Sequence, residues 1–101
     1  MLGTYNLTKI ADLMLVKNLC VSYGKDNIRC NAIAPGLVQT NFARELWENE
    51  TLLEKTIERT PLKRIAQPSD IAGIAVYLAS QAGAWTSGQT FVIDGGMDAV
   101  E

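Results

Sequence analysis

The longest uninterrupted stretch of the chain, residues 5–23, contains neither proline nor glycine and therefore predicts a long helix. We expect Thr4 to cap its start and Gly24 to end it, because glycine commonly follows the last helical residue. A surface helix of a lone domain needs an apolar face of only about 100°. Here the apolar residues spread around more than one stripe: Leu7, Ile10, Leu13, Met14, Val16, Leu19, Cys20 and Val21. The helix should therefore be covered on two sides, by its own sheet and by another helix.

Two short strands are predicted farther along the chain. Residues 28–34 begin with alternating apolar and polar side chains and end in small ones, and Pro35-Gly36 then breaks the strand sharply. A buried strand is expected over residues 90–94, after a helix over residues 69–80 that Pro68 opens. Because helices and strands alternate, the predicted fold class is α/β, with the two strands side by side in a parallel sheet.

The segment from about residue 41 to residue 67 is more polar and irregular than its surroundings. Asn41 is expected to cap a short helix that runs to about Glu48. Thr51 should cap a second helix that runs to about Arg59 and ends before Pro61, since residues 51–54 fit the capping-box pattern. We expect a helical insert here.

Length and composition restrict the kind of protein. A chain of 101 residues forms one domain at most, over residues 1–101, and buries roughly 60–70% of its unfolded surface, enough for a small core. Hydrophobic content of 48% and charged content of 20% indicate a globular chain. A net charge of −2 with scattered basic residues argues against a nucleic-acid partner.

The cysteines bear on metal sites and on the compartment. Cys20 and Cys30 lie ten residues apart, and there is no histidine, which excludes a His/Cys zinc site and argues against any metal. We interpret both thiols as small apolar core residues in a reducing compartment. Neither a signal-peptide pattern nor an apolar run of membrane-spanning length occurs, so we expect a cytoplasmic protein with no membrane partner.

The start of the long helix carries a candidate proton-transfer pair. Tyr5 and Lys9 are four residues apart and so share one helix face. A free tyrosine ionises near pH 10, and a nearby ammonium lowers that pKa toward the range in which a general acid or base works. Taken alone, the same spacing also fits a solvated lysine beside a half-buried tyrosine.

Further motifs follow Tyr5-x-x-x-Lys9 in a fixed order. They are the strand Ile28-Arg-Cys-Asn-Ala-Ile-Ala-Pro-Gly36, then Leu37-Val38-x-Thr40, the helix start Pro68-Ser-Asp-Ile-Ala72, and the terminal Ser87-Gly-Gln89…Val92-Ile-Asp-Gly-Gly96. Together they resemble the C-terminal portion of a short-chain dehydrogenase/reductase, and the resemblance covers essentially the whole chain. It implies part of a Rossmann-like, doubly wound parallel sheet and an NAD(P)-dependent oxidoreductase that moves hydride between nicotinamide and a carbonyl or alcohol.

The resemblance also implies residue roles. Tyr5 would exchange the substrate proton, and Lys9 would lower its pKa and bind the nicotinamide ribose. The Pro35-Gly36 turn, the backbone of Val38 and the hydroxyl of Thr40 would border the cofactor, whether NAD or NADP. From the residues alone, Thr40 could equally cap a helix and Pro-Gly could form only a turn. The 41–67 segment matches the variable loop over substrate, where Leu46 and Trp47 either face substrate or pack helices.

Much of the family pattern does not occur in the chain. There is no G-x-x-x-G-x-G turn for the pyrophosphate, and no serine precedes Tyr5. We therefore expect a truncated member or fragment that is inactive alone. The alternatives are a non-enzymatic, self-associating remnant and a weak small-ligand-binding module. Because strand 28–34 and helix 5–23 lack partners, we expect the chain to associate with itself, at least as a dimer.

Overall fold

The computed structural model describes the backbone of residues 2–100 and the side chains of residues 10–99. Its helices are α1 (Leu2–Tyr23), α2 (Arg44–Glu48), α3 (Glu50–Arg59) and α4 (Pro68–Ala79), and its strands are β1 (Ala32–Pro35) and β2 (Thr90–Ile93). Short 3-10 helices occupy Gly24–Asp26, Gln81–Gly83 and Met97–Val100. The predicted order of helix, strand, helical insert, helix and strand is confirmed.

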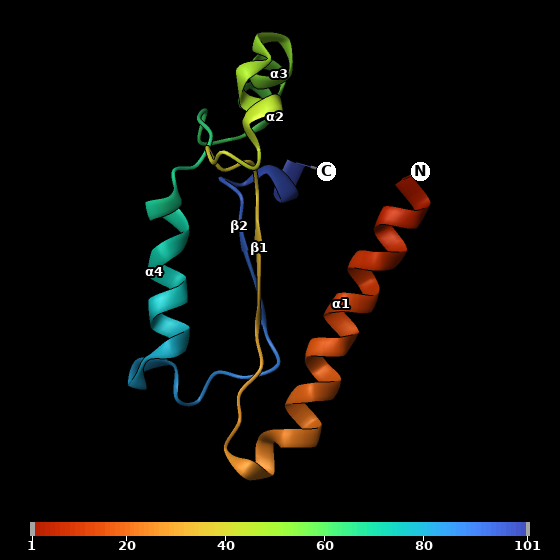
Figure 1. The fold of residues 1–101 in the computed structure, drawn as a ribbon, viewed down its shortest axis with the longest axis vertical. Coiled ribbons are helices and arrows are strands. Elements are labelled where there is room, and N and C mark those ends of the chain that lie inside the picture. The colour runs from red at the N-terminus through yellow and green to blue at the C-terminus, as the bar shows by residue number, and fades with distance from the viewer. Residues whose placement is uncertain (1, 101) are drawn as a thin grey trace. The chain divides into compact units, whose positions relative to one another are not determined.

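The strands β1 and β2 form a two-stranded parallel sheet, as predicted, and run side by side in Figure 1. The Ala32 amide donates to Gln89 O over 2.8 Å, and the Gly36 amide donates to Ile93 O over 2.9 Å. These bonds tie the start of β1 to Gln89, just before β2, and Gly36, just after β1, to the end of β2.

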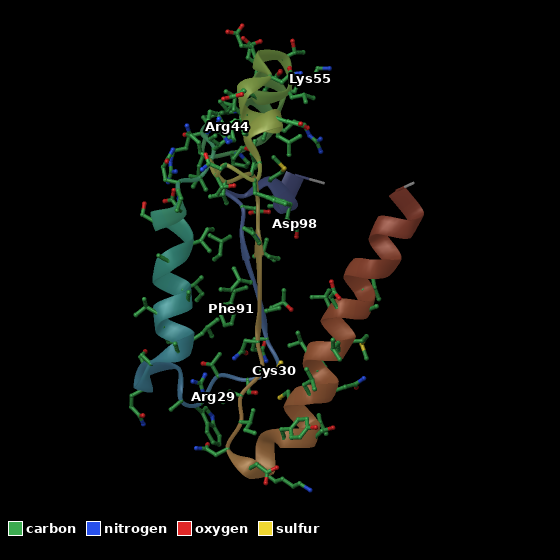
Figure 2. The ribbon with its side chains drawn as sticks, in the orientation of Figure 1. Arg29, Cys30, Arg44, Lys55, Phe91 and Asp98 are labelled. Carbon is green, nitrogen blue, oxygen red and sulfur yellow. The ribbon has the colours of Figure 1, made fainter. Side chains whose placement is uncertain are left out.

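The predicted strand over residues 28–34 is wrong at its start, because β1 begins at Ala32. The residues before it pair with the 86–89 loop through one backbone bond, from the Gly88 amide to Cys30 O over 2.7 Å, and through several bonds that involve side chains. The Cys30 amide donates to Ser87 Oγ over 3.1 Å, and Asn31 Nδ2 donates to Thr86 O over 2.9 Å. Arg29, whose side chain is labelled in Figure 2, donates from Nη1 to the same carbonyl over 3.4 Å.

Three predicted helix caps are also wrong. Helix α1 already begins at Leu2, so Thr4 lies inside it. Helix α2 has Ala43 at its N-cap, and Asn41 Oδ1 instead accepts from Arg44 Nη2 over 2.8 Å. Helix α3 is capped two residues earlier than expected: Asn49 Oδ1 accepts from the Leu52 amide over 3.1 Å, because Asn49, and not Thr51, directly precedes the first helical residue.

The chain divides into two compact units. Unit 1 comprises Met1–Ala32 with Tyr77–Phe91, and unit 2 comprises Ile33–Val76 with Val92–Glu101. The assignment of residues 1–101 to one partial domain stays a prediction.

The expected core is not found among the described side chains. No hydrophobic side chain in residues 10–99 is fully buried, and Thr60, 4% exposed, is the buried polar residue of that range. On α1, none of residues 10–23 is buried, and Val21 is 83% exposed, so the predicted cover on two sides is absent from this part of the helix. Cys20 and Cys30 are unpaired and half-buried, and thus are not core residues.

Among the described helices, none combines the length and apolarity needed to cross a membrane.

Candidate functional site

The segment after β1 lies in unit 2, at the carboxyl end of the parallel strands, where open α/β sheets bind their ligands. Here Val38 pairs with Ala66 in a parallel bridge. The Ala66 amide donates to Leu37 O over 3.0 Å, and the Gln39 amide donates to Ala66 O over 2.9 Å. Because the bridge uses the groups on either side of Val38, the N–H and C=O of Val38 itself point away from Ala66. They form an adjacent donor and acceptor.

Thr40 lies at the turn that leads into α2. The Ala43 amide is shared between Thr40 O and Thr40 Oγ1, at 3.2 Å from each. The hydroxyl oxygen therefore accepts a hydrogen bond, while its own hydrogen stays free to be donated. Thr40 does not cap α2, whose N-cap is Ala43 without a side-chain cap bond. Its bond from the Ala43 amide closes the turn before the helix and is compatible with donation to a ligand.

Trp47 contacts the same residue from α2. Its indole Nε1 donates to Thr40 O over 2.7 Å, and the side chain is half-buried. The sequence offered substrate contact or helix packing for Trp47, and its spacing gave no signal for a hydrogen bond to the backbone seven residues earlier. Leu46 beside it is 51% exposed.

The Pro35-Gly36 turn packs against the residue that follows β2. A methyl group at Gly36 would lie 3.1 Å from both Cα and Cβ of Asp94, so the close approach to Asp94 favours glycine here. Asp94 is itself fixed, since Oδ1 accepts from the Gly96 amide over 2.9 Å and Oδ2 accepts from the Asp98 amide over 2.8 Å. The turn, which we expect to border the cofactor, therefore has a packing role.

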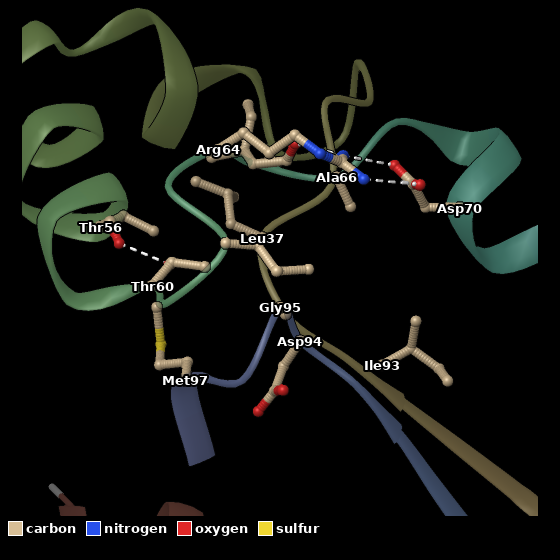
Figure 3. A pocket seen from close by; sticks show the side chains of 13 residues that line it. Leu37, Thr56, Thr60, Arg64, Ala66, Asp70, Ile93, Asp94, Gly95 and Met97 are labelled. Atoms are coloured by element: carbon tan, nitrogen blue, oxygen red, sulfur yellow. Dashed lines mark hydrogen bonds and ion pairs between the residues drawn. The ribbon is translucent and has the colours of Figure 1, made fainter. Parts of the chain in front are cut away.

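A pocket of about 130 Å³ lies next to this turn, within unit 2 (Figure 3). It is lined by Gly36, Leu37, Thr56, Thr60, Leu62, Arg64, Ile65, Ala66, Asp70, Ile93, Asp94, Gly95 and Met97. Its polar side chains are largely paired with one another or with the backbone: Thr60 Oγ1 donates to Thr56 O over 2.6 Å, and Arg64 binds Asp70. Of the predicted cofactor residues, Gly36 lines this pocket, whereas Pro35, Val38 and Thr40 do not.

The pair of Arg64 and Asp70 holds the start of α4. Arg64 Nη1 and Nη2 donate to the two carboxylate oxygens over 2.8 and 3.0 Å, and the Gln67 amide donates to Asp70 Oδ2 over 2.8 Å. Hydrogen bonding to Arg64 first, and then to the Gln67 amide, lowers the pKa of Asp70 to about 2. The same contact with Asp70 raises the pKa of Arg64. Both groups are therefore ionised at neutral pH and serve to fix the backbone near Ala66.

The predicted proton-transfer pair lies on α1, in unit 1. The backbone places Tyr5 and Lys9 one helical turn apart, as expected. Their side chains fall outside the described residues, so their roles stay predictions. Within residues 10–99, no three His, Cys, Asp or Glu side chains come together as a metal site would require.

Comparison with known proteins identifies the family. A family profile described as "Enoyl-(Acyl carrier protein) reductase" matches residues 1–98. The chain belongs to this family of short-chain dehydrogenases/reductases. The pig protein "Dehydrogenase/reductase SDR family member 4" (Sus scrofa) is 42% identical over 95 residues, which cover 94% of this chain and 34% of that protein.

Solved structures of the family share the fold. A 4-hydroxyisoleucine dehydrogenase complexed with NADH is 34% identical to this chain, with a TM-score of 0.88. The match covers 96% of this chain and 40% of the dehydrogenase chain. A gluconate 5-dehydrogenase from Burkholderia cenocepacia J2315, in complex with NADP and tartrate, is 35% identical, with a TM-score of 0.87 over 94% of this chain and 37% of its own. Among the curated relatives it matches, the chain spans about a third of their length. The predicted Rossmann-like α/β fold is confirmed.

Proposed function

We propose that the chain supplies the C-terminal part of an NAD(P)-dependent oxidoreductase that acts on a small carbonyl or alcohol. The observation that carries this proposal is the family match over residues 1–98, which includes Tyr5, Lys9 and the whole 35–40 segment. Two similar structures are described as complexes with NADH and with NADP, which supports a nicotinamide cofactor and leaves the choice between NAD and NADP open.

The proposed chemistry assigns proton transfer to α1. Tyr5 donates a proton to the carbonyl oxygen during reduction and takes it back during oxidation. Lys9, one turn away, stabilises the phenolate, lowers the pKa of Tyr5 and binds the ribose hydroxyls. A bound nicotinamide supplies or accepts the hydride. The part of the chain in this reaction is to orient Tyr5 and Lys9 toward the substrate carbonyl and the nicotinamide.

The 35–40 segment fits the rim of a cofactor site. The N–H and C=O of Val38, which the bridge to Ala66 leaves unused, match the acceptor and donor of a carboxamide. The Thr40 hydroxyl can donate to a phosphate or carboxamide oxygen, because its bond from the Ala43 amide uses the oxygen as acceptor and leaves the hydrogen available. Pro35 and Gly36 border the same site at the end of β1.

We further propose that the chain has no turnover alone and needs a completing N-terminal portion. The test mixes or co-expresses the chain with the N-terminal portion of the pig relative and measures NADH and NADPH oxidation over a panel of carbonyls. Activity should appear only in the mixture and should disappear in Tyr5→Phe. Tyr23→Phe, at the far end of α1, is the matched control and should retain activity. Equal rates in Tyr5→Phe would overturn the assignment.

A second candidate function is self-association, at least as a two-fold dimer. It is supported by the apolar side chains left exposed in residues 10–99 and by β1 and β2, each of which has one strand partner in the described part of the chain. Sedimentation should then give at least twice the 11.0 kDa chain mass. A stable folded monomer would contradict this proposal.

A third candidate is a weak small-ligand-binding module, favoured by the pocket of about 130 Å³ in unit 2. Binding of a small carbonyl compound without turnover, with shifts of the Leu37 and Met97 resonances, would support it.

As the cellular compartment we propose the reducing cytoplasm, which the unpaired Cys20 and Cys30 support.

A further inference from the structure

We propose that Trp47 is a positioning residue for the cofactor site, and that it acts on the cofactor through Thr40. This inference rests on the proposed function, in which the Thr40 hydroxyl donates to the cofactor. The observation behind it is the 2.7 Å hydrogen bond from Trp47 Nε1 to Thr40 O, which links the last residues of α2 to the rim of the site.

The contacts of Thr40 show what the indole adds. Upstream, Gln39 is fixed twice, through its amide to Ala66 O and through its side chain, whose Oε1 accepts from Gln67 Nε2 over 2.8 Å. Downstream, the Ala43 amide is the hydrogen-bond donor to the Thr40 hydroxyl, and it divides between that oxygen and the Thr40 carbonyl at 3.2 Å each. A shared bond of this length restrains the peptide only weakly. The shorter bond from Trp47 therefore sets the orientation of the Thr40 carbonyl.

The orientation of the carbonyl determines what the hydroxyl can do. While Trp47 holds Thr40 O, the Ala43 amide stays within reach of Oγ1 and occupies its acceptor side. The hydroxyl hydrogen is then left to donate to an anionic or carbonyl oxygen of the cofactor. Without the indole N–H, the carbonyl is free to rotate toward the Ala43 amide, and the hydroxyl loses the partner that fixes its direction. Preorganised donors of this kind bind their acceptors more tightly than mobile ones.

The position of Trp47 makes this role testable apart from general packing. Trp47 is half-buried on α2, whereas Trp85, in unit 1, is fully exposed. Replacement by phenylalanine keeps an aromatic ring at the site but removes the N–H donor together with part of the indole, whereas 3-benzothienylalanine removes the N–H alone. Trp85→Phe is the matched control, since it makes the same chemical change in a side chain that is fully exposed to solvent.

The experiment is a double-mutant cycle on the affinity for NADH, measured by the fluorescence of NADH in the assembly of the chain with the N-terminal portion of the pig relative. We expect Trp47→Phe to raise the Kd about five- to tenfold, the loss typical of one hydrogen bond. Thr40→Val should raise it by a similar factor, and the double variant should bind no more weakly than Thr40→Val alone. Trp85→Phe should leave the Kd unchanged.

The outcomes separate this inference from the proposed function. If the unaltered assembly does not bind NADH, the proposed function fails and the role of Trp47 fails with it. If it binds NADH and Trp47→Phe binds equally well, or if the two substitutions add fully, only the positioning role is overturned. Should Trp47→Phe not fold, 3-benzothienylalanine at position 47 preserves the shape of the indole without its N–H. The same rise in Kd is then expected.

Discussion

Substituting alanine for Gly36 tests whether the turn after β1 is held by packing against Asp94. The added methyl group would lie 3.1 Å from Cα and Cβ of Asp94, a few tenths of an ångström inside ordinary contact. Asp94 has little room to yield, because its carboxylate accepts from the Gly96 and Asp98 amides. Overpacking of this kind costs about 1–3 kcal/mol, against a gain of about 0.4–1 kcal/mol from the less flexible unfolded chain. We therefore expect a net local loss of about 1 kcal/mol.

Amide hydrogen exchange measures this loss where it occurs. The amide of residue 36 donates to Ile93 O over 2.9 Å, so its exchange should become about fivefold faster, as should that of the Gly96 amide. Gly73→Ala is the control: it lies inside α4 with nothing within 4 Å of the added methyl, and it should stabilise the helix by about 0.5–1 kcal/mol. Unchanged exchange at residue 36 would refute the packing argument and leave cofactor approach as the reason for the glycine.

Three further predictions concern the elements around the site. Asn49→Ala should lower the stability of α3 by about 1 kcal/mol in circular dichroism, whereas Thr51→Ala should have little effect; the reverse order would contradict the observed cap. The pKa of Asp70 is about 2 in the folded chain against an ordinary 3.8, so its contribution to stability is present above about pH 4 and is lost as the pH falls through 2. An NMR titration of its carboxyl inflecting near pH 4 would exclude this pairing. Gly83→Ala would place a methyl group 2.5 Å from Tyr77 O and should destabilise unit 1 by about 2 kcal/mol in urea, and an unchanged midpoint would argue against that close approach.

Local chemistry made some elements predictable from sequence. The absence of proline and glycine, followed by Gly24, predicted the end of α1 at Tyr23. Pro68 at the first helical position predicted the start of α4, and the run at residues 90–94 predicted β2 to within one residue. In each case the signal lies within a few residues of the feature.

Features that depend on distant partners were not predictable in the same way. The pattern of residues 28–31 predicted a strand, yet these residues form bonds that mix side-chain and backbone groups with the Thr86–Gln89 loop, more than fifty residues away. Burial was overestimated because the pattern on α1 shows which faces are apolar without showing what covers them. In the candidate site, the order of the motifs proposed Val38 and Thr40 as cofactor residues, a prediction that stays open. The bridge to Ala66 and the bond from Trp47 could be seen only in the folded chain.

The most direct test of the central claim is to map NADH onto the chain by NMR. The ¹⁵N-labelled chain, assembled with the N-terminal portion of the pig relative, is titrated with NADH. We predict saturable shifts of the Val38 and Thr40 amides, with no shift of the Lys55 and Glu58 amides on α3. Saturable binding that leaves Val38 and Thr40 unmoved would contradict the placement of the cofactor at the end of β1.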